Sequence, residues 1–171
     1  MPMILAPGAA FSGHVDLEIS RGCRWRCAFC AAGHVITPYR ELQLEALEPS
    51  LAWALAQRGK VGLIGTDVSD HSGLEAIVRG IWDRGGQVAL PSLRVERLGD
   101  EDSAALRLIR QRPPRTVTMA VEAADEALRR QLNKRLDDDR LRQAAENMAA
   151  AGVANLRVYL LAAVPGERWE H

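Results

Sequence analysis

The stretch Val15-Asp-Leu-Glu-Ile-Ser20-Arg-Gly-Cys23-Arg-Trp-Arg-Cys27-Ala-Phe-Cys30 joins a strand pattern to a cysteine cluster. Apolar and polar residues alternate from Val15 to Ser20, as in a β-strand with one buried face. The three cysteines that follow are the only ones in the chain and lie within eight residues. An odd, clustered set of this kind favours metal binding over disulfide bonds.

The cysteine spacing, three residues and then two, indicates which metal group would bind. Thiolates are soft ligands that select iron–sulfur clusters, zinc or Cu(I). A 4Fe–4S cube held by Cys23, Cys27 and Cys30 leaves one iron open to a substrate. Arginines flank the cysteines, and positive charge there stabilises thiolates and an anionic cluster. We therefore expect a 4Fe–4S cluster on these three residues.

Two other interpretations of the cysteine loop stay open at this point. His34 lies four residues after Cys30, so a Cys3His zinc site in a structural or binding module is an alternative. Structural zinc ligands, however, usually come as two pairs separated by a loop. The other alternative is an iron–sulfur protein that serves only in electron transfer. Unliganded structural thiols would not explain the clustering.

Composition fits one globular domain without a strong overall charge. The chain has 171 residues, 47% of them hydrophobic, and its 22 basic residues balance 22 acidic ones. The charge balance does not favour nucleic acid or anionic membrane surfaces. The apolar segment Met1–Ala10 lacks the basic region of a signal peptide, and no run approaches the ~20 apolar residues of a membrane helix. We expect a cytoplasmic protein with no membrane partner and no indicated nucleic-acid partner.

Strand-like and helix-like segments alternate along the rest of the chain. Hydrophobic periodicity and Gly or Pro breaks predict strands at 15–20, 61–64, 87–90, 116–121 and 155–164, and helices at 42–57, 73–83, 101–110, 125–132 and 139–151. This alternation predicts an α/β fold with right-handed crossovers and a parallel sheet. The last strand is nearly all apolar, which is typical of a parallel strand covered on both faces.

Ligands of parallel α/β sheets bind at the carboxyl ends of the strands. The cysteine loop and the turns that begin at Gly65, Ser92, Glu122 and Pro165 should therefore meet at one edge. We expect that edge to be the functional site.

The cysteine loop resembles that of the radical S-adenosylmethionine superfamily, with Phe29 as the aromatic residue before the last cysteine. The lead-in Glu18-Ile-Ser-Arg-Gly22-Cys23 is similar to that of the cobalamin-associated and methylthiotransferase-like branches. The resemblance implies a partial (βα)6 barrel, of which this chain would hold about five βα units. It also implies that the open iron binds S-adenosylmethionine, and that an electron cleaves it to methionine and a 5′-deoxyadenosyl radical that abstracts hydrogen from a substrate.

The same resemblance implies which residues hold S-adenosylmethionine. Phe29 would lie near the adenine, with a core phenylalanine as the alternative. The turn Gly65-Thr66-Asp67 stands where relatives have Gly-Gly-Glu, so its backbone or Asp67 would accept from the ligand ammonium, unless it is an ordinary turn. Glu122, at the end of the fourth strand, would bind the ribose hydroxyls. Lys134 follows Asn133 where relatives have an arginine for the methionine carboxylate; a solvated lysine is the alternative.

Other candidates rest on their place at strand ends. Ser92 and Arg94 follow the third strand and could face the ligand or the substrate, or Arg94 could pair with an acid. Tyr159 is assigned to the ligand-facing side of the fifth strand. The histidines His14, His71 and His171 have no partner at metal spacing and are expected to be structural.

The resemblance also sets expectations for partners. We expect residues 1–171 to form a single, truncated core domain, because a sixth strand is missing. An external electron donor is required. The lateral opening of the partial barrel would be covered by a further domain, a cobalamin-binding domain or a second copy of the chain.

Overall fold

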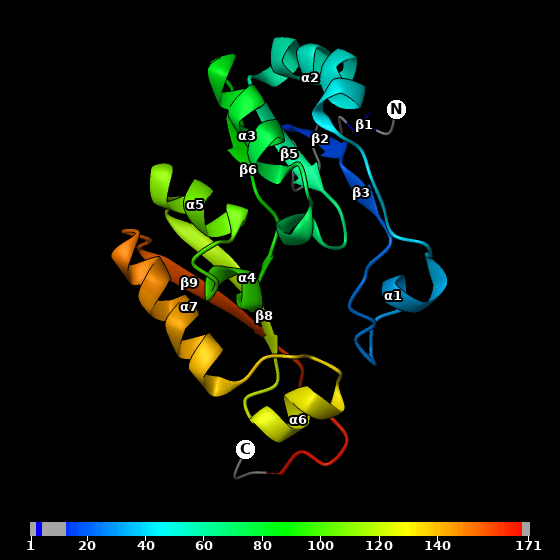
Figure 1. Ribbon diagram of the computed structural model, residues 1–171, viewed down its shortest axis with the longest axis vertical. Coiled ribbons are helices and arrows are strands. Elements are labelled where there is room, and N and C mark those ends of the chain that lie inside the picture. Colours follow the sequence, from blue (N-terminus) through cyan, green and yellow to red (C-terminus); the bar gives the residue numbers. More distant parts are fainter. Residues whose placement is uncertain (1–2, 5–12, 169–171) are drawn as a thin grey trace.

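The computed structural model describes residues 3–4 and 13–168, and Figure 1 traces them in chain order. The strands are β1 (Met3–Ile4), β2 (Val15–Glu18), β3 (Ser20–Arg21), β4 (Arg40–Glu41), β5 (Lys60–Ile64), β6 (Gln87–Ala89), β7 (Leu93–Arg94), β8 (Thr116–Glu122) and β9 (Asn155–Leu160). The helices are α1 (Ala32–Val35), α2 (Leu44–Arg58), the 3-10 turn η1 (Val68–Asp70), α3 (Leu74–Asp83), α4 (Val95–Leu98), α5 (Ala104–Gln111), α6 (Glu126–Gln131) and α7 (Asp138–Ala150).

The main strands pair in parallel, as the alternation of strands and helices predicts. β2 pairs with β5, and β5 with β6; β8 lies between β7 and β9. The third strand of the fold is divided into β6, which corresponds to the predicted strand at 87–90, and β7, which was not predicted; the two join different neighbours. Pro91 lies at the division and has no N–H to donate to a ladder. The result is an α/β fold in which five successive βα units form a partial barrel that does not close within the described residues.

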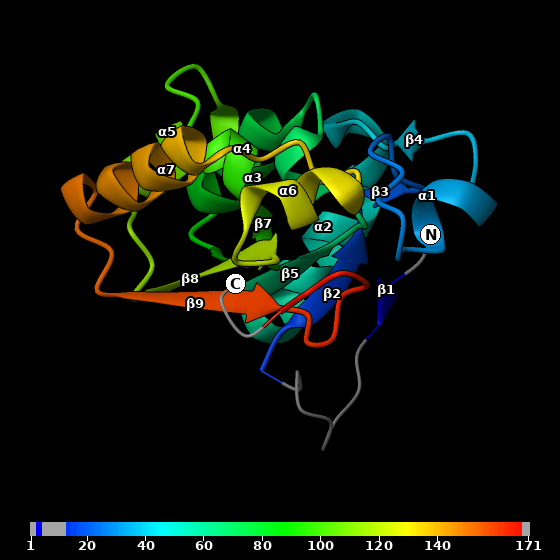
Figure 2. The ribbon, with the colours of Figure 1, turned by 90° about the horizontal axis from the view of Figure 1, so that it is seen from below.

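The described helices cover one face of the sheet, and none of them covers the other face (Figure 2). The predicted helix at 42–57 is confirmed as α2, and its Leu47 and Leu51 are fully buried against β2 and β5. A second buried cluster joins α5 and α7 to β8 through Leu106, Met148 and Met119, among others. Apolar burial of this kind is the dominant stabilising contribution to the fold.

The fifth strand differs from its prediction in two respects. β9 ends at Leu160 rather than residue 164, and every residue in it is exposed, although cover on both faces was expected. The reason is its position: β9 pairs only with β8 and forms the edge of its sheet in the described chain. Its apolar side chains Leu156, Val158 and Leu160 are therefore 40%, 44% and 57% exposed.

The short elements around the cysteines were not predicted. β3 and β4 form an antiparallel pair, Ser20 with Glu41 and Arg21 with Arg40, on the two sides of the cysteine loop and α1. This pair draws the two ends of the loop together. No helix among the described residues is long and apolar enough to cross a membrane.

Candidate functional site

The cysteine loop is a compact turn between β3 and α1. Its three thiols are free, Cys27 buried and Cys23 and Cys30 partly buried. The amide of Cys30 donates to the carbonyl of Cys27 at 3.1 Å, and an imidazole nitrogen of His34 lies 3.1 Å from the same carbonyl oxygen. Gly33 packs so closely that a Cβ there would lie 2.9 Å from the backbone of Arg26.

The end of α6 holds the loop from the other side. The carbonyl of Leu132 accepts from the amide of Ala28 at 2.9 Å. The side-chain amide of Asn133 donates to the carbonyls of Trp25 and Arg26, at 3.2 and 2.9 Å. Leu132 and Asn133 thus lie against the cysteine loop.

Lys134 follows Asn133 and points into a buried ionic group. Its side chain is 2% exposed, and its Nζ lies 3.8 Å from Oε1 of Glu122. Burial, and secondly the charge of Arg94, lower the pKa of Lys134, while Glu96, Glu122 and Cys27 oppose that shift. The alternative of a solvated lysine is therefore wrong.

Arg94 lies between the cysteine loop and an acid. Its guanidinium carbon is 3.9 Å from the ring centroid of Trp25, within the range of cation–π attraction, and it forms an ion pair with Glu96. The alternative that Arg94 pairs with an acid is thus confirmed. Nε of Arg94 and Oε2 of Glu96 are buried without a hydrogen-bond partner in the described chain.

Asp67 is the least satisfied polar residue at this edge. It is 2% exposed, and neither carboxylate oxygen has a hydrogen-bond partner among the described residues. Burial, and secondly the charge of Asp70, raise its pKa to about 7. In the same turn, a Cβ on Gly65 would lie 2.3 Å from Oγ of Ser20, and the Thr66 hydroxyl donates to the carbonyl of Gly22. A buried acid without a partner is costly, so Asp67 is suited to accept from a cationic ligand.

Asp70, Trp25 and Arg97 form a contact that sequence reasoning missed. The indole nitrogen of Trp25 donates to Oδ2 of Asp70 at 2.5 Å, and Arg97 pairs with the other oxygen of Asp70. The link ties the cysteine loop to η1 and α4. No local sequence pattern indicates this contact, because Trp25 lies far from Asp70 and Arg97 in the sequence. The pairing of Glu96 with Arg94, by contrast, could have been predicted from its position two residues after Arg94.

The remaining predicted residues lie outside this buried group. Phe29 is 45% exposed, so the alternative of a core phenylalanine is wrong. Ser92 and Tyr159 line one cavity of about 430 Å³ that also includes the partly buried pair His14–Asp16, whose Nε2 and Oδ1 are 2.9 Å apart.

The two remaining histidines with a structural prediction are His71 and His171. His71 is buried: one ring nitrogen lies 3.2 Å from the carbonyl oxygen of Ile19, and the other accepts from the amide of Gly73. This is a structural role, as expected. His171 lies outside the described residues.

The loop offers three free thiols, which are soft donors that an iron–sulfur cluster can use. One zinc ion draws its ligands to about 2.0–2.3 Å from one point, whereas the three thiolates of a cube bind three different irons. Among the described residues, no three His, Cys, Asp or Glu are grouped to hold one ion. Burial raises the pKa of Cys23, with a further rise from the charges of Asp67 and Cys27, so its thiolate would depend on bound metal. The three free thiols on one loop fit a 4Fe–4S cluster.

Comparisons with known proteins agree with this fold. The solved structures of similar fold include the cobalamin-dependent S-adenosylmethionine radical enzyme OxsB. Its form with aqua-cobalamin aligns with a TM-score of 0.67, and its form with aqua-cobalamin and S-adenosylmethionine with 0.68. Each comparison has 18% identity and covers 85% of this chain and 23% of OxsB.

Sequence relatives extend over most of the chain. An uncharacterized protein of Methanocaldococcus jannaschii is 31% identical over an alignment of 158 residues that covers 88% of this chain. The chain spans only 33% of that relative's length. A sequence profile of the Radical SAM superfamily, where SAM stands for S-adenosylmethionine, matches residues 17–171. The chain therefore belongs to the radical SAM superfamily.

Proposed function

We propose that this chain is the S-adenosylmethionine-binding core of a radical enzyme, with a 4Fe–4S cluster on Cys23, Cys27 and Cys30. The observation that carries the proposal is the unpartnered, buried carboxylate of Asp67 at the same edge as the three free thiols. An acid of this kind needs a cationic partner. The ammonium group of S-adenosylmethionine, held beside a cluster, would supply one.

The buried ionic group gives a site for the other end of the amino acid. Lys134 and Arg94 are largely buried cations, and their charges interact with Cys27 and Cys23 respectively. They would hold the methionine carboxylate, Lys134 as a point charge and Arg94 through the free Nε. Glu122 adopts a left-handed backbone with φ of 77° at the bulge that ends the ladder of β8 with β9. It would accept from the ribose hydroxyls.

The rest of the ligand would lie over the loop and the open face. Phe29 is exposed beside the last cysteine and would pack on the adenine, and the backbone of Gly65 and Thr66 would contact the amino group. Ser92 and Tyr159 line the cavity on the open face and would meet the nucleoside or the substrate. When bound, the reduced cluster supplies the electron that cleaves S-adenosylmethionine to methionine and a 5′-deoxyadenosyl radical for hydrogen abstraction.

The enzyme would need partners that this chain does not itself supply. We propose an external electron donor for the cluster and a cover over the open face of the partial barrel. The cover would be a further domain of a longer protein or a second copy of the chain. Since OxsB is cobalamin-dependent and is about four times as long as the matched region, a cobalamin-binding domain is one form of that cover.

Anaerobic reconstitution tests the proposal directly. We expect about four irons and four sulfides per chain, saturable binding of S-adenosylmethionine, and 5′-deoxyadenosine after reduction with dithionite. Stoichiometric zinc without sulfide would instead support the zinc-site interpretation. A stable cluster without S-adenosylmethionine binding would support an electron-transfer protein. The Asp67→Asn variant should keep its iron while it binds S-adenosylmethionine about tenfold more weakly or worse.

A further inference from the structure

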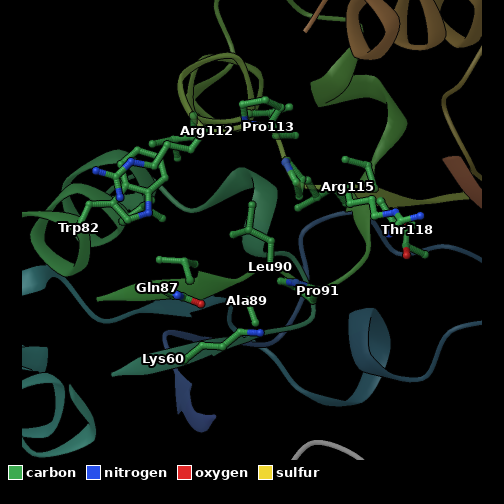
Figure 3. Close-up of a pocket in the computed structure, with 18 of the residues that line it drawn as sticks. Lys60, Trp82, Gln87, Ala89, Leu90, Pro91, Arg112, Pro113, Arg115 and Thr118 are labelled. Carbon is green, nitrogen blue, oxygen red and sulfur yellow. The ribbon is translucent and has the colours of Figure 1, made fainter. Parts of the chain in front are cut away.

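A second cavity, of about 660 Å³, opens at the end of the sheet opposite the cysteine loop (Figure 3). Its strand residues include Lys60, Gln87 and Thr116, which are the first residues of β5, β6 and β8. The cavity exists because the third strand is divided: β6 pairs with β5 but not with β8, and β7 joins β8 only at Met119 and Ala120. The strands therefore diverge at their amino ends. The volume is in the usual range of small-molecule sites, about 300–1,000 Å³.

The interior of this cavity is apolar and contains an aromatic side chain. Leu90 and Leu108 contribute to its floor, and Trp82 of α3 forms one side. The guanidinium carbon of Arg112 lies 4.6 Å from the ring centroid of Trp82. Figure 3 shows these two side chains together at one side of the cavity, with Arg115 and Thr118 at the other. A flat apolar group would find contacts here that a hydrated inorganic ion would not.

The charged groups around the cavity all have one sign. Lys60, Arg112 and Arg115 line it, and no Asp or Glu does. None of the three cations has an ion pair within the described chain. On the helix α5 that precedes Arg112, by contrast, Arg107 pairs with Glu75 and Arg110 with Glu101. The positive charge at the cavity is therefore left uncompensated while neighbouring arginines are neutralised.

We propose that this cavity binds a small organic anion with a flat apolar body and one carboxylate, sulfonate or phosphate group. The apolar body would enter between β6 and β8 toward Leu90 and Leu108. The anionic group would face Arg112, Arg115 and Lys60, where Arg can form two parallel hydrogen bonds to such a group. The site is separate from the cysteine loop, and the proposal does not depend on the cluster or on S-adenosylmethionine.

A pair of fluorescent probes tests the site. 1-Anilinonaphthalene-8-sulfonate carries the anionic group, and N-phenyl-1-naphthylamine has the same aromatic body without it. The intact reconstituted chain should bind the sulfonate with one saturable site, about tenfold or more tighter than the amine. In the double variant Arg112→Gln, Arg115→Gln, the affinity for the sulfonate should fall by about the same factor, and that for the amine should stay unchanged.

Arg142→Gln is the matched control, because Arg142 is exposed on α7 and lies outside the cavity lining. It should change neither affinity. Both substituted arginines are exposed, and the circular dichroism spectrum and iron content of the variants would verify that the fold is kept. Equal binding of the two probes by the parent chain would overturn the proposal. An affinity for the sulfonate that survives the double substitution would do the same.

Discussion

The side-chain amide of Asn133 donates a 2.9 Å hydrogen bond to the carbonyl oxygen of Arg26, across 107 residues of sequence. A second bond, to the carbonyl of Trp25, comes from the same nitrogen. Arg26 and Asn133 both have a left-handed backbone, with φ of 51° and 55°. The loop that carries the cysteines is thus held in shape by a residue of a different βα unit.

Removal of the Asn133 amide should loosen the cysteine loop. Asn133→Gly keeps access to the left-handed backbone but loses both hydrogen bonds, at a cost of about 1 kcal/mol each. We expect the reconstituted variant to bleach several times faster in air than the parent chain, measured by the decay of its visible absorbance. Asn133→Ala should be worse, because alanine is also strained at this φ. If Asn133→Gly retains its cluster as long as the parent, the two bonds do not brace the loop.

Gly33 makes a second contact with the same part of the loop. A Cβ added at position 33 would lie 2.9 Å from backbone atoms of Arg26. Because these are backbone atoms, the movement of a side chain could not relieve the clash. Gly33→Ala should therefore lower the iron content per chain, although alanine is favoured over glycine within a helix. Gly13→Ala is the control, since a Cβ at Gly13 meets nothing within 4 Å. Iron analysis after reconstitution would compare the iron content of the Gly33→Ala and Gly13→Ala variants.

Single removal of each cysteine should abolish the cluster. Two thiolates cannot hold a cube that needs three, so Cys23→Ala, Cys27→Ala and Cys30→Ala should each retain almost no iron or sulfide. His34→Ala should keep both, because its imidazole contacts the carbonyl of Cys27 and the loss is one hydrogen bond. A loss of metal in His34→Ala as complete as in the cysteine variants would favour a Cys3His zinc site.

The sequence predicted the order of the strands and helices well because their signals are local. The leucine spacing of α2 sets the face that packs on the sheet, and Gly59 ends the helix with a left-handed φ of 64°. β9 shows the limit of that approach. Its apolar run predicts burial on both faces, yet burial depends on which elements lie next to the strand, and only β8 does so in the described chain.

The residues of the candidate site could be predicted only where they belong to a recognisable sequence motif. The cysteines, Asn133-Lys134 and the turn at Asp67 stand at offsets typical of the family, and the structure brings them to one edge. The pairing of Trp25 with Asp70 has no sequence signal, since it depends on how η1 folds against the loop. The burial of Lys134 also could not be read from the sequence, because lysines at helix ends are usually solvated.

Lys134 and Glu122 should contribute to ligand affinity rather than to cluster binding. In the proposed binding mode, Lys134→Ala and Glu122→Ala would each remove a charge-assisted hydrogen bond to S-adenosylmethionine, worth about 1.5–3 kcal/mol, or about tenfold and more in affinity. Iron content should be unchanged. Arg135→Ala, which removes an adjacent exposed cation, should bind the ligand normally. Anaerobic isothermal titration calorimetry would measure all three, and parent-like affinity in both variants would contradict the assignment.

Asp67 should make the stability of the metal-free chain depend on pH. Its pKa rises from 3.8 to about 7 in the folded chain, first through burial and secondly through the charge of Asp70. The folded chain therefore holds this proton up to about pH 7, whereas the unfolded chain releases it near pH 4. Between these values the folded state binds more protons.

This difference in proton binding sets the sign of the effect: the free energy of unfolding should fall as pH rises from about 4 to about 7 and then level off. The full penalty is on the order of 4 kcal/mol. Asp67→Asn replaces the ionisable group by a neutral one of similar shape and should remove this slope. Urea unfolding of both chains in metal-free buffer, at intervals across this range, gives the comparison. The variant should gain stability relative to the parent as pH increases. A difference that stays constant with pH would mean that Asp67 is not held protonated in the folded chain, and that a cationic ligand is not needed to stabilise its charge.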